Sequence, residues 1–164
     1  MKDREIIDAA NRVLAAARTV GLKVATAESC TGGLVAAALT EIAGSSDVVE
    51  RGFVTYSNAA KQEMLGVRPA TIAKHGAVSE ETAREMALGA LEHSRGTIAL
   101  AITGIAGPGG GSAAKPVGTV CFAWARKGEA VSVETRRFSG DRDAVRRQSV
   151  EHALRKVLDL LDAS

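Results

Sequence analysis

The chain has few of the residues that mark secreted, membrane-spanning or nucleic-acid-binding proteins. It carries 2 cysteines in 164 residues, too few for the disulfide framework of a small secreted domain. Aromatic residues make up 3% of the chain, so stacking platforms for nucleic-acid bases are not available in number. The formal net charge is +2, which by itself does not argue for a polyanionic partner.

Long apolar runs and metal-ligand clusters are missing too. No stretch approaches the roughly 20 apolar residues of a membrane span, and the charged segment Met1–Glu5 lacks the apolar centre of a secretion signal. The cysteines and histidines do not have the spacing of a zinc site. We therefore expect a cytoplasmic protein with no membrane contact, no nucleic-acid partner and no bound metal.

What the chain does have is an alternation of helical and strand-like patterns. Helical spacing or capping signals predict helices over 3–20, 33–43, 58–65, 80–94 and from 139–141 to about 161. Apolar and β-branched runs indicate strands over 22–27, 48–56 and 97–103, and a hairpin over 117–125 and 130–138. Arg68-Pro69 and His75-Gly76 indicate loop. We expect one α/β domain over 1–164, a three-layer sandwich with a mixed β-sheet flanked by helices.

The most informative segment is Thr26–Gly33, which lies between a predicted strand and a predicted helix. A serine at such a turn can place its hydroxyl beside a helix N-terminus, where free N–H groups favour a developing anion. Ser29 is therefore a candidate nucleophile for acyl transfer or hydrolysis. The alternative is that Ser29, Thr31 and the glycines only cap the helix. The segment is not a GxSxG elbow, because Ala27 and Thr31 occupy the glycine positions.

A serine nucleophile needs a base, and no histidine lies near Ser29 in the sequence. A lysine can serve if burial lowers its pKa toward neutrality. Lys61 lies on a short predicted helix directly after the strand that ends at Tyr56, so both side chains could face one cleft. The alternatives are a solvated helix lysine and a core or rim aromatic.

The segment Gly104–Ser112 is the most glycine-rich loop of the chain and follows a predicted strand. Glycine there lets backbone N–H groups approach an anion closely, and the alternative is a mobile connection. The P-loop motif is absent, since no Gly-Lys-Ser/Thr occurs. Pro116 and the preceding glycines argue against the helix that a dinucleotide fingerprint at Gly109–Ala114 or an SxxK motif at Ser112–Lys115 would need.

Several motifs occur in order along nearly the whole chain. They are Ala27–Gly33, Gly52–Asn58 with Lys61, Leu65–Val67, Gly76–Ser79, Thr103–Pro108 and Lys115–Thr119. Together they resemble the C-terminal domain family of the competence/damage-inducible protein CinA. That family includes stand-alone enzymes that hydrolyse the carboxamide of nicotinamide mononucleotide to nicotinate mononucleotide and ammonia. The resemblance implies this activity, without a cofactor, and suggests a homo-oligomer, most simply a dimer.

The resemblance also implies a chemical role for three side chains. Ser29 would be the nucleophile and Lys61 the general base, and Tyr56 would assist proton transfer or position the substrate. Cys30 would be a neighbour of the site with its side chain pointing away.

Further residues would bind the substrate by the same resemblance. Glu28, Thr31, Gly32 and Gly33 form the turn around the nucleophile, and backbone groups near the last three would make the oxyanion hole. Thr103, Gly104, Gly107 and Pro108 would line the nucleotide site. An arginine is expected for the phosphate, and we choose Arg146, with Arg142 as the competitor.

Two other outcomes remain open. Some family members carry this domain behind an N-terminal pyrophosphatase-like domain. Because the chain starts at Met1 and enters a helix at once, we expect no such domain here.

The alternative function is a non-catalytic nucleotide-binding or interaction module linked to competence or the DNA damage response. A hydrolase of another small amide would share the mechanism and differ in its pocket.

Overall fold

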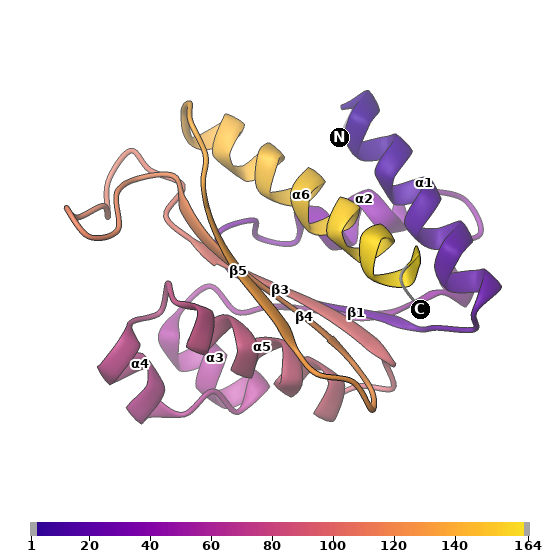
Figure 1. The fold of residues 1–164 in the computed structure, drawn as a ribbon, viewed down its shortest axis with the longest axis horizontal. Helices are drawn as coiled ribbons and strands as arrows, with labels where there is room; N and C mark the ends of the chain where they lie inside the picture. The colour runs from indigo at the N-terminus through magenta and orange to yellow at the C-terminus, as the bar shows by residue number, and fades with distance from the viewer. Residues whose placement is uncertain (1–2, 163–164) are drawn as a thin grey trace.

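The computed structural model describes residues 3–162, so the two ends of the expected domain, residues 1–2 and 163–164, lie outside it. The elements in chain order are α1 (Arg4–Thr19), β1 (Val24–Glu28), α2 (Leu34–Thr40), the 3-10 helix η1 (Ser45–Asp47), β2 (Val49–Val54), α3 (Asn58–Leu65), α4 (Pro69–His75), α5 (Glu80–Glu92), β3 (Ile98–Gly104), β4 (Thr119–Arg126), β5 (Ser132–Arg137) and α6 (Arg142–Asp162). A central sheet separates α1, α2 and α6 from α3, α4 and α5 (Figure 1). The predicted α/β fold with helices on both faces of a mixed sheet is confirmed.

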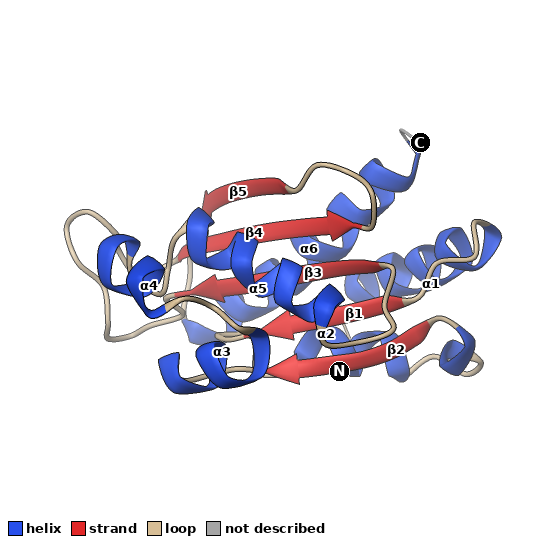
Figure 2. Cartoon of the chain, turned by 90° about the horizontal axis from the view of Figure 1, so that it is seen from below, coloured by secondary structure: helices blue, strands red, loops and turns tan. Residues whose placement is uncertain are grey.

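The sheet has five strands in the order β2-β1-β3-β4-β5 (Figure 2). β1 runs parallel to β2 and to β3, whereas β4 is antiparallel to β3 and β5. The chain leaves β1 toward β2 on one side and later returns to β3 on the other side. Between β1 and β3 the order therefore reverses, and open α/β sheets bind ligands beside the carboxyl ends of the strands at such a point.

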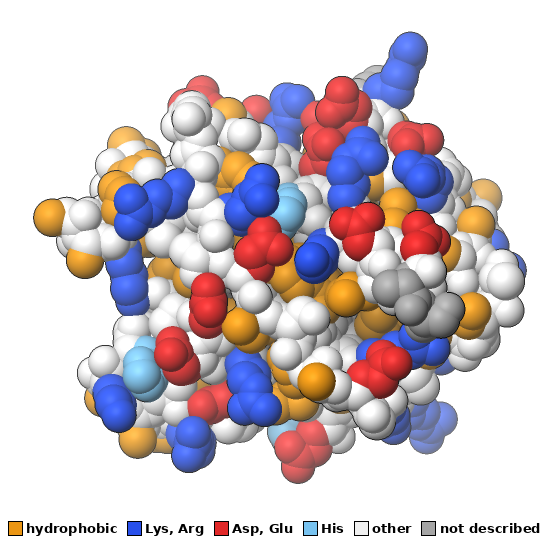
Figure 3. Space-filling view, in the orientation of Figure 1, with side chains coloured by type: hydrophobic (Ala, Val, Ile, Leu, Met, Phe, Trp, Pro, Cys, Tyr) orange, Lys and Arg blue, Asp and Glu red, His pale blue; other side chains and the backbone are white. Residues whose placement is uncertain are grey.

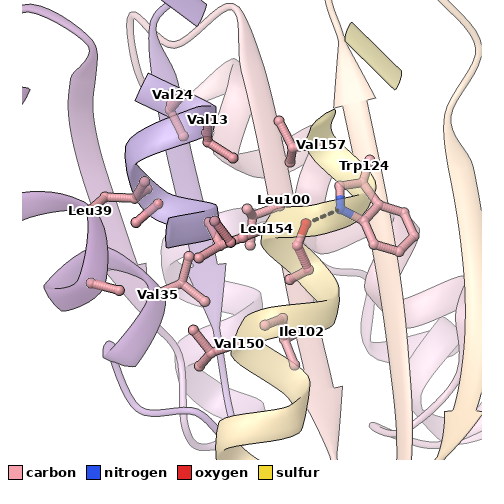
Figure 4. Close-up of a cluster of buried hydrophobic side chains, with 14 of the residues drawn as sticks. Val13, Val24, Val35, Leu39, Leu100, Ile102, Trp124, Val150, Leu154 and Val157 are labelled. Atoms are coloured by element: carbon pink, nitrogen blue, oxygen red, sulfur yellow. Dashed lines mark hydrogen bonds between the residues drawn. The ribbon is translucent and has the colours of Figure 1, made fainter. Parts of the chain in front are cut away.

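One face of the sheet carries large side chains and packs against α1, α2 and α6 (Figure 4). Leu100, Ile102, Phe122 and Trp124 belong to this face, because alternate residues of a strand point the same way. The Trp124 indole nitrogen donates to the Ala153 carbonyl of α6 at 3.1 Å. A buried indole N–H needs such an acceptor, so this bond fixes how α6 crosses the sheet.

The other face is made almost entirely of small side chains. Its strand residues are Ala25, Ala27, Ala99, Ala101, Cys121, Ala123 and Ala125. Helix α5 presents alanines of its own to this face, among them Ala83, Ala87 and Ala90. Small residues on both sides let the helix approach the strands closely. Helix α3 then packs on α5, where a Cβ on Gly89 would lie 1.9 Å from the Leu65 carbonyl oxygen.

Most predicted elements are found, and two differ. The predicted helix over 33–43 is shorter, since α2 ends at Thr40. Loop was predicted at Arg68-Pro69 and at His75-Gly76, but Pro69 and His75 are the first and last residues of the helix α4. Proline at the first helical position and basic residues in the last turn are normal helix-end signals. The prediction of loop at Pro69 and His75 is therefore wrong.

The surface is chemically mixed. On the face shown in Figure 3, acidic and basic side chains are interspersed, in keeping with the net charge of +2. Over residues 3–162, none of the helices is both long enough and apolar enough to cross a membrane.

The contact between α3 and α5 can be tested with Gly89→Ala. The added methyl group would overlap the Leu65 carbonyl, so the helices must separate, and we expect the free energy of unfolding to fall by about 1–3 kcal/mol. Gly109→Ala is the matched control, because nothing lies within 4 Å of its Cβ position. Urea denaturation of both variants measures the difference, and equal stabilities would contradict this packing.

Candidate active site

Ser29 lies directly after β1, at the point where the strand order reverses. Its backbone N–H donates to the Ile102 carbonyl of β3 at 2.9 Å, and the Thr55 N–H donates to the Glu28 carbonyl at 2.8 Å. The ends of β1, β2 and β3 are thereby tied together around the serine. Gly32 and Gly33 follow with φ of 57° and 100°, values that side-chain-bearing residues rarely adopt, and so the chain can turn at once into α2.

Lys61 reaches the serine from the other side of the sheet. Ser57 caps α3 by accepting from the Ala60 N–H at 3.0 Å, which fixes the first turn of the helix that carries Lys61. The lysine side chain is only 1% exposed. Its Nζ lies 3.1 Å from Ser29 Oγ, 3.0 Å from the Thr55 carbonyl and 3.3 Å from the Tyr56 carbonyl.

This environment sets the protonation chemistry of Lys61. Burial lowers the pKa of the amine below its ordinary value of 10.5, because a charged group loses its hydration there. A neutral amine has two N–H bonds and one lone pair. The two carbonyls can accept both N–H bonds, which leaves the lone pair for the Ser29 hydroxyl. The arrangement can therefore deprotonate the serine.

Both side chains open into a cavity of about 290 Å³. It is lined by Ser29, Cys30, Tyr56, Asn58, Lys61, Ala77, Val78, Thr103, Gly104, Ile105, Ala106, Gly107, Gly109, Gly110 and Arg142. The lining comes from the strand ends, the first turn of α3, the loop before α5, the glycine loop and the start of α6. Of the predicted site residues, the cavity brings together Ser29, Tyr56, Lys61, Thr103, Gly104 and Gly107.

Glu28 does not line the cavity. Its side chain is fully buried and accepts hydrogen bonds from Thr31 Oγ1 at 2.7 Å, the Val35 N–H at 2.9 Å and the Ala36 N–H at 3.1 Å. Burial raises the pKa of this carboxyl, and the hydrogen bonds from Thr31 and the amides oppose the rise. Glu28 is thus turned toward the start of α2, and in place of the substrate contact expected from sequence it holds the turn after the serine.

The two candidate arginines occupy different places. Arg142 lines the cavity, and it donates to the Gly107 carbonyl at 2.8 Å and to the Tyr56 hydroxyl at 3.3 Å. Arg146 is not among the lining residues, and it donates to the carbonyls of Cys30 and Thr31. The structure therefore favours the competitor, Arg142, over Arg146 as the arginine that can meet a ligand in the cavity.

Cys30 is among the residues that border the cavity. Its side chain is nevertheless only 5% exposed and belongs to the core beneath α1, α2 and α6. Burial raises the pKa of the thiol to about 12. A thiol with that pKa is protonated at neutral pH, and the thiolate is the reactive form. Cys30 is therefore a poor nucleophile beside Ser29.

The remaining predicted residues form the rim or lie behind it. Thr103 Oγ1 donates to the Ala77 carbonyl at 2.8 Å, which joins β3 to the loop before α5. The lining residues do not include Thr31, Gly32, Gly33 or Pro108.

Two residues that line the cavity were not predicted from the sequence. Asn58 precedes Lys61 by three residues and so shares its helix face. Val78 was also missed, and no chemical signal marked it. Among residues 3–162, no His, Cys, Asp or Glu side chains gather in threes as metal ligands.

Comparison with known proteins places this architecture in a family. The family model described as the CinA C-terminal domain matches residues 7–161. The nicotinamide-nucleotide amidohydrolase PncC of Escherichia coli K12 is 57% identical over 157 residues, covering 94% of this chain and 93% of that protein. A CinA-like protein of Chloroherpeton thalassium is 54% identical over 88% of this chain, which spans 35% of that longer protein.

A solved structure has the same fold throughout. The crystal structure of the competence/damage inducible protein CihA from Agrobacterium tumefaciens superposes with a TM-score of 0.95 at 50% identity, covering 99% of this chain and 98% of that one. The sequence motifs, the fold and these matches all indicate the same family, and the chain belongs to the CinA C-terminal domain family.

Proposed function

We propose that this protein is a nicotinamide-nucleotide amidohydrolase that converts nicotinamide mononucleotide and water to nicotinate mononucleotide and ammonia through an acyl-enzyme on Ser29. The similarity to PncC, which bears that activity in its name, extends over nearly the full length of both chains. The observation that carries the mechanism is the 3.1 Å separation between Lys61 Nζ and Ser29 Oγ in a buried pair that opens into the cavity.

In the acylation half, neutral Lys61 takes the proton of the Ser29 hydroxyl as Oγ attacks the amide carbon. A tetrahedral intermediate forms, with its negative charge on the former amide oxygen. Lys61 then gives the proton to the amide nitrogen, the C–N bond breaks and ammonia leaves. The product on the enzyme is an ester between Ser29 and the nicotinoyl group.

In the deacylation half, Lys61 acts as base again. It takes a proton from a water molecule, whose oxygen attacks the ester carbon. When the second intermediate collapses, the bond to Ser29 Oγ breaks and the proton on Lys61 returns to the serine. The carboxylic acid leaves and the pair regains its starting state.

Backbone amides of the turn are the oxyanion donors in this proposal. Within residues 3–162, the N–H groups of Cys30 and Thr31 donate to no carbonyl of another residue. They lie beside Ser29 and before the N-terminus of α2, whose dipole favours negative charge. A well-placed donor of this kind is worth roughly 3 kcal/mol of transition-state stabilisation.

Arg142 is the proposed ligand of the substrate phosphate. Its guanidinium lies at the rim of the cavity between the glycine loop and Tyr56, and arginine binds phosphate oxygens through paired, charge-assisted hydrogen bonds. Tyr56 is 63% exposed, so its ring is free to position the pyridine or ribose. Thr103 and Gly104 line the same cavity.

We also propose that the protein acts in the cytoplasm as a homo-oligomer, as the family resemblance suggests. Strand β2 is an edge of the sheet. Apolar side chains are exposed on β2 and on the helix α3 that follows it, with Val54 at 48% and Met64 at 41%. An open strand edge with exposed apolar side chains on it and after it suits contact with a second copy.

Replacing the nucleophile tests the reaction. Ser29→Ala is expected to lower the rate of ammonia release from nicotinamide mononucleotide by about 10⁴-fold or more. Cys30→Ala should keep most of the activity, because the thiol is protonated at neutral pH. An ammonia assay on both variants gives the answer. Full activity in Ser29→Ala would exclude the serine mechanism, and a dead Cys30→Ala beside an active Ser29→Ala would move the nucleophile to the thiol.

The assignment of Lys61 as general base predicts how kcat/KM depends on pH. Only neutral Lys61 can accept the serine proton, so kcat/KM should rise with pH as Lys61 deprotonates and level off below the ordinary lysine pKa of 10.5, because burial lowers the pKa. Lys61→Arg should lose about 10²–10⁴-fold in rate at every pH, since a guanidinium stays protonated. Lys74→Arg, at an exposed position on α4, is the matched control. A wild-type profile in Lys61→Arg would rule out this base.

Phosphate recognition is tested separately. Arg142→Ala should raise KM for nicotinamide mononucleotide by about 10- to 100-fold, the loss expected for a hydrogen bond to a charged group. The KM for nicotinamide riboside, which has no phosphate, should hardly change. Steady-state kinetics on both substrates, with exposed Arg136→Ala as the control, checks this. An equal rise in KM for both substrates would argue against a phosphate contact.

A further inference from the structure

Arg146 makes two hydrogen bonds to the backbone that follows Ser29. It lies on α6, one turn after Arg142, and reaches across to the turn that follows Ser29. Its Nε donates to the Cys30 carbonyl at 3.0 Å and its Nη2 donates to the Thr31 carbonyl at 3.3 Å. These are successive carbonyls, so one planar guanidinium spans two peptide groups of the segment that follows Ser29, residues 30–33, which we call the nucleophile turn.

We propose that Arg146 is a positioning residue of the amidase reaction, which fixes the nucleophile turn and strengthens the oxyanion donor that the turn supplies. The proposal rests on the proposed function. The Cys30 carbonyl and the Thr31 N–H belong to one peptide group. A charge-assisted hydrogen bond to the carbonyl oxygen polarises that group, and its N–H becomes a better donor toward the developing negative charge.

The local backbone is shaped to receive this side chain. Gly32 has φ of 57°, and a Cβ there would lie 3.3 Å from Arg146 Nη2. That separation is closer than ordinary van der Waals contact, so a larger residue at position 32 would push the guanidinium away. Glycine at this position therefore serves both the turn and the approach of Arg146.

Glu28 contacts the same turn through the side chain of Thr31. Thr31 is fully buried, its hydroxyl donates to Glu28 Oε1 at 2.7 Å and its carbonyl accepts from Arg146. A buried carboxyl group and a guanidinium thus fix one residue by its side chain and by its backbone. Because Ser29 lies two residues before Thr31, these two contacts restrict the serine and the amides that follow it.

The competing role is the one expected from sequence, in which Arg146 binds the substrate phosphate. The two roles move different kinetic constants. A phosphate ligand contributes to binding in the ground state, so its loss raises KM. A group that acts through the oxyanion donor contributes mainly in the transition state, so its loss lowers kcat and leaves KM nearly unchanged.

The kinetic test compares Arg146→Ala and Arg146→Lys with wild type on nicotinamide mononucleotide. We expect Arg146→Ala to lower kcat by about 10- to 100-fold, the range for hydrogen bonds to a charged group, with little change in KM. Arg146→Lys should recover part of kcat, because an ammonium can reach one carbonyl but cannot span two as a planar fork does. Arg155→Ala is the matched control, since Arg155 pairs with Glu151 on the same helix. A raised KM with unchanged kcat would overturn the proposal.

A second measurement does not depend on catalysis. Cys30 lies inside the turn and is 5% exposed, so its reaction with an aromatic disulfide reagent reports opening of the turn. In a Cys121→Ala background, Arg146→Ala should speed this reaction by about 10-fold or more, the population change expected when a charge-assisted hydrogen bond is lost. Arg155→Ala should leave the rate unchanged.

The kinetic constants and the rate of Cys30 modification distinguish a failure of this proposal from a failure of the proposed function. An unchanged Cys30 rate in Arg146→Ala would overturn the proposal, whatever the kinetics show. If wild-type protein releases no ammonia from nicotinamide mononucleotide, the proposed function fails, whereas the Cys30 rates still decide whether Arg146 fixes the turn. If Arg146→Ala does not fold, Arg146→Lys supplies the same comparison, because it weakens the contact and keeps a cation on α6.

Discussion

The burial of one amine beside one hydroxyl is the constraint on which the rest of this structure depends. Lys61 Nζ is removed from water and has three partners, the Ser29 hydroxyl and the carbonyls of Thr55 and Tyr56. A charged amine in such a place loses its hydration, and the protein lowers that cost by favouring the neutral form. Neutrality is also what a general base requires. The fold must therefore bring the ends of β1 and β2 and the first turn of α3 to within hydrogen-bonding distance of one another.

The small-residue face of the sheet makes this approach possible. Alanines on β1, β3 and β4 let α5 lie close to the strands, and Gly89 lets α3 lie against α5 with no side chain between the backbones. The face under α1, α2 and α6 carries large apolar side chains instead and supplies most of the buried apolar surface. Bulkier residues on the alanine face would push α5 outward and carry α3 with it. Lys61 would then lie beyond reach of Ser29, even in a protein that still folds.

The sequence predicted which residues of the site lie at strand ends and helix starts, because that follows from chain order. It did not predict in which direction a side chain points from its helix or strand. Ser29 follows a strand and Lys61 follows a helix cap, so order alone placed both at strand ends. Arg142 and Arg146 are four residues apart on one helix, and neighbouring turns of a helix present the same face, so sequence could not decide which reaches the cavity. Strand alternation could have predicted where the Glu28 side chain lies, because Glu28 shares a face of β1 with Val24 and so points toward α2.

The site is divided between the two helical layers, and this division has a chemical consequence. The nucleophile turn and Arg142 belong with α2 and α6, whereas the base comes from α3 on the opposite face of the sheet (Figure 1). Substitutions in the α3 layer act on the burial of Lys61 and hence on its pKa. Substitutions in the α6 layer act on the turn and on the charge at the rim. The glycine loop after β3 borders the cavity without contributing the nucleophile or the base, so it can vary in shape and alter which amide enters while the pair that cleaves it stays in place.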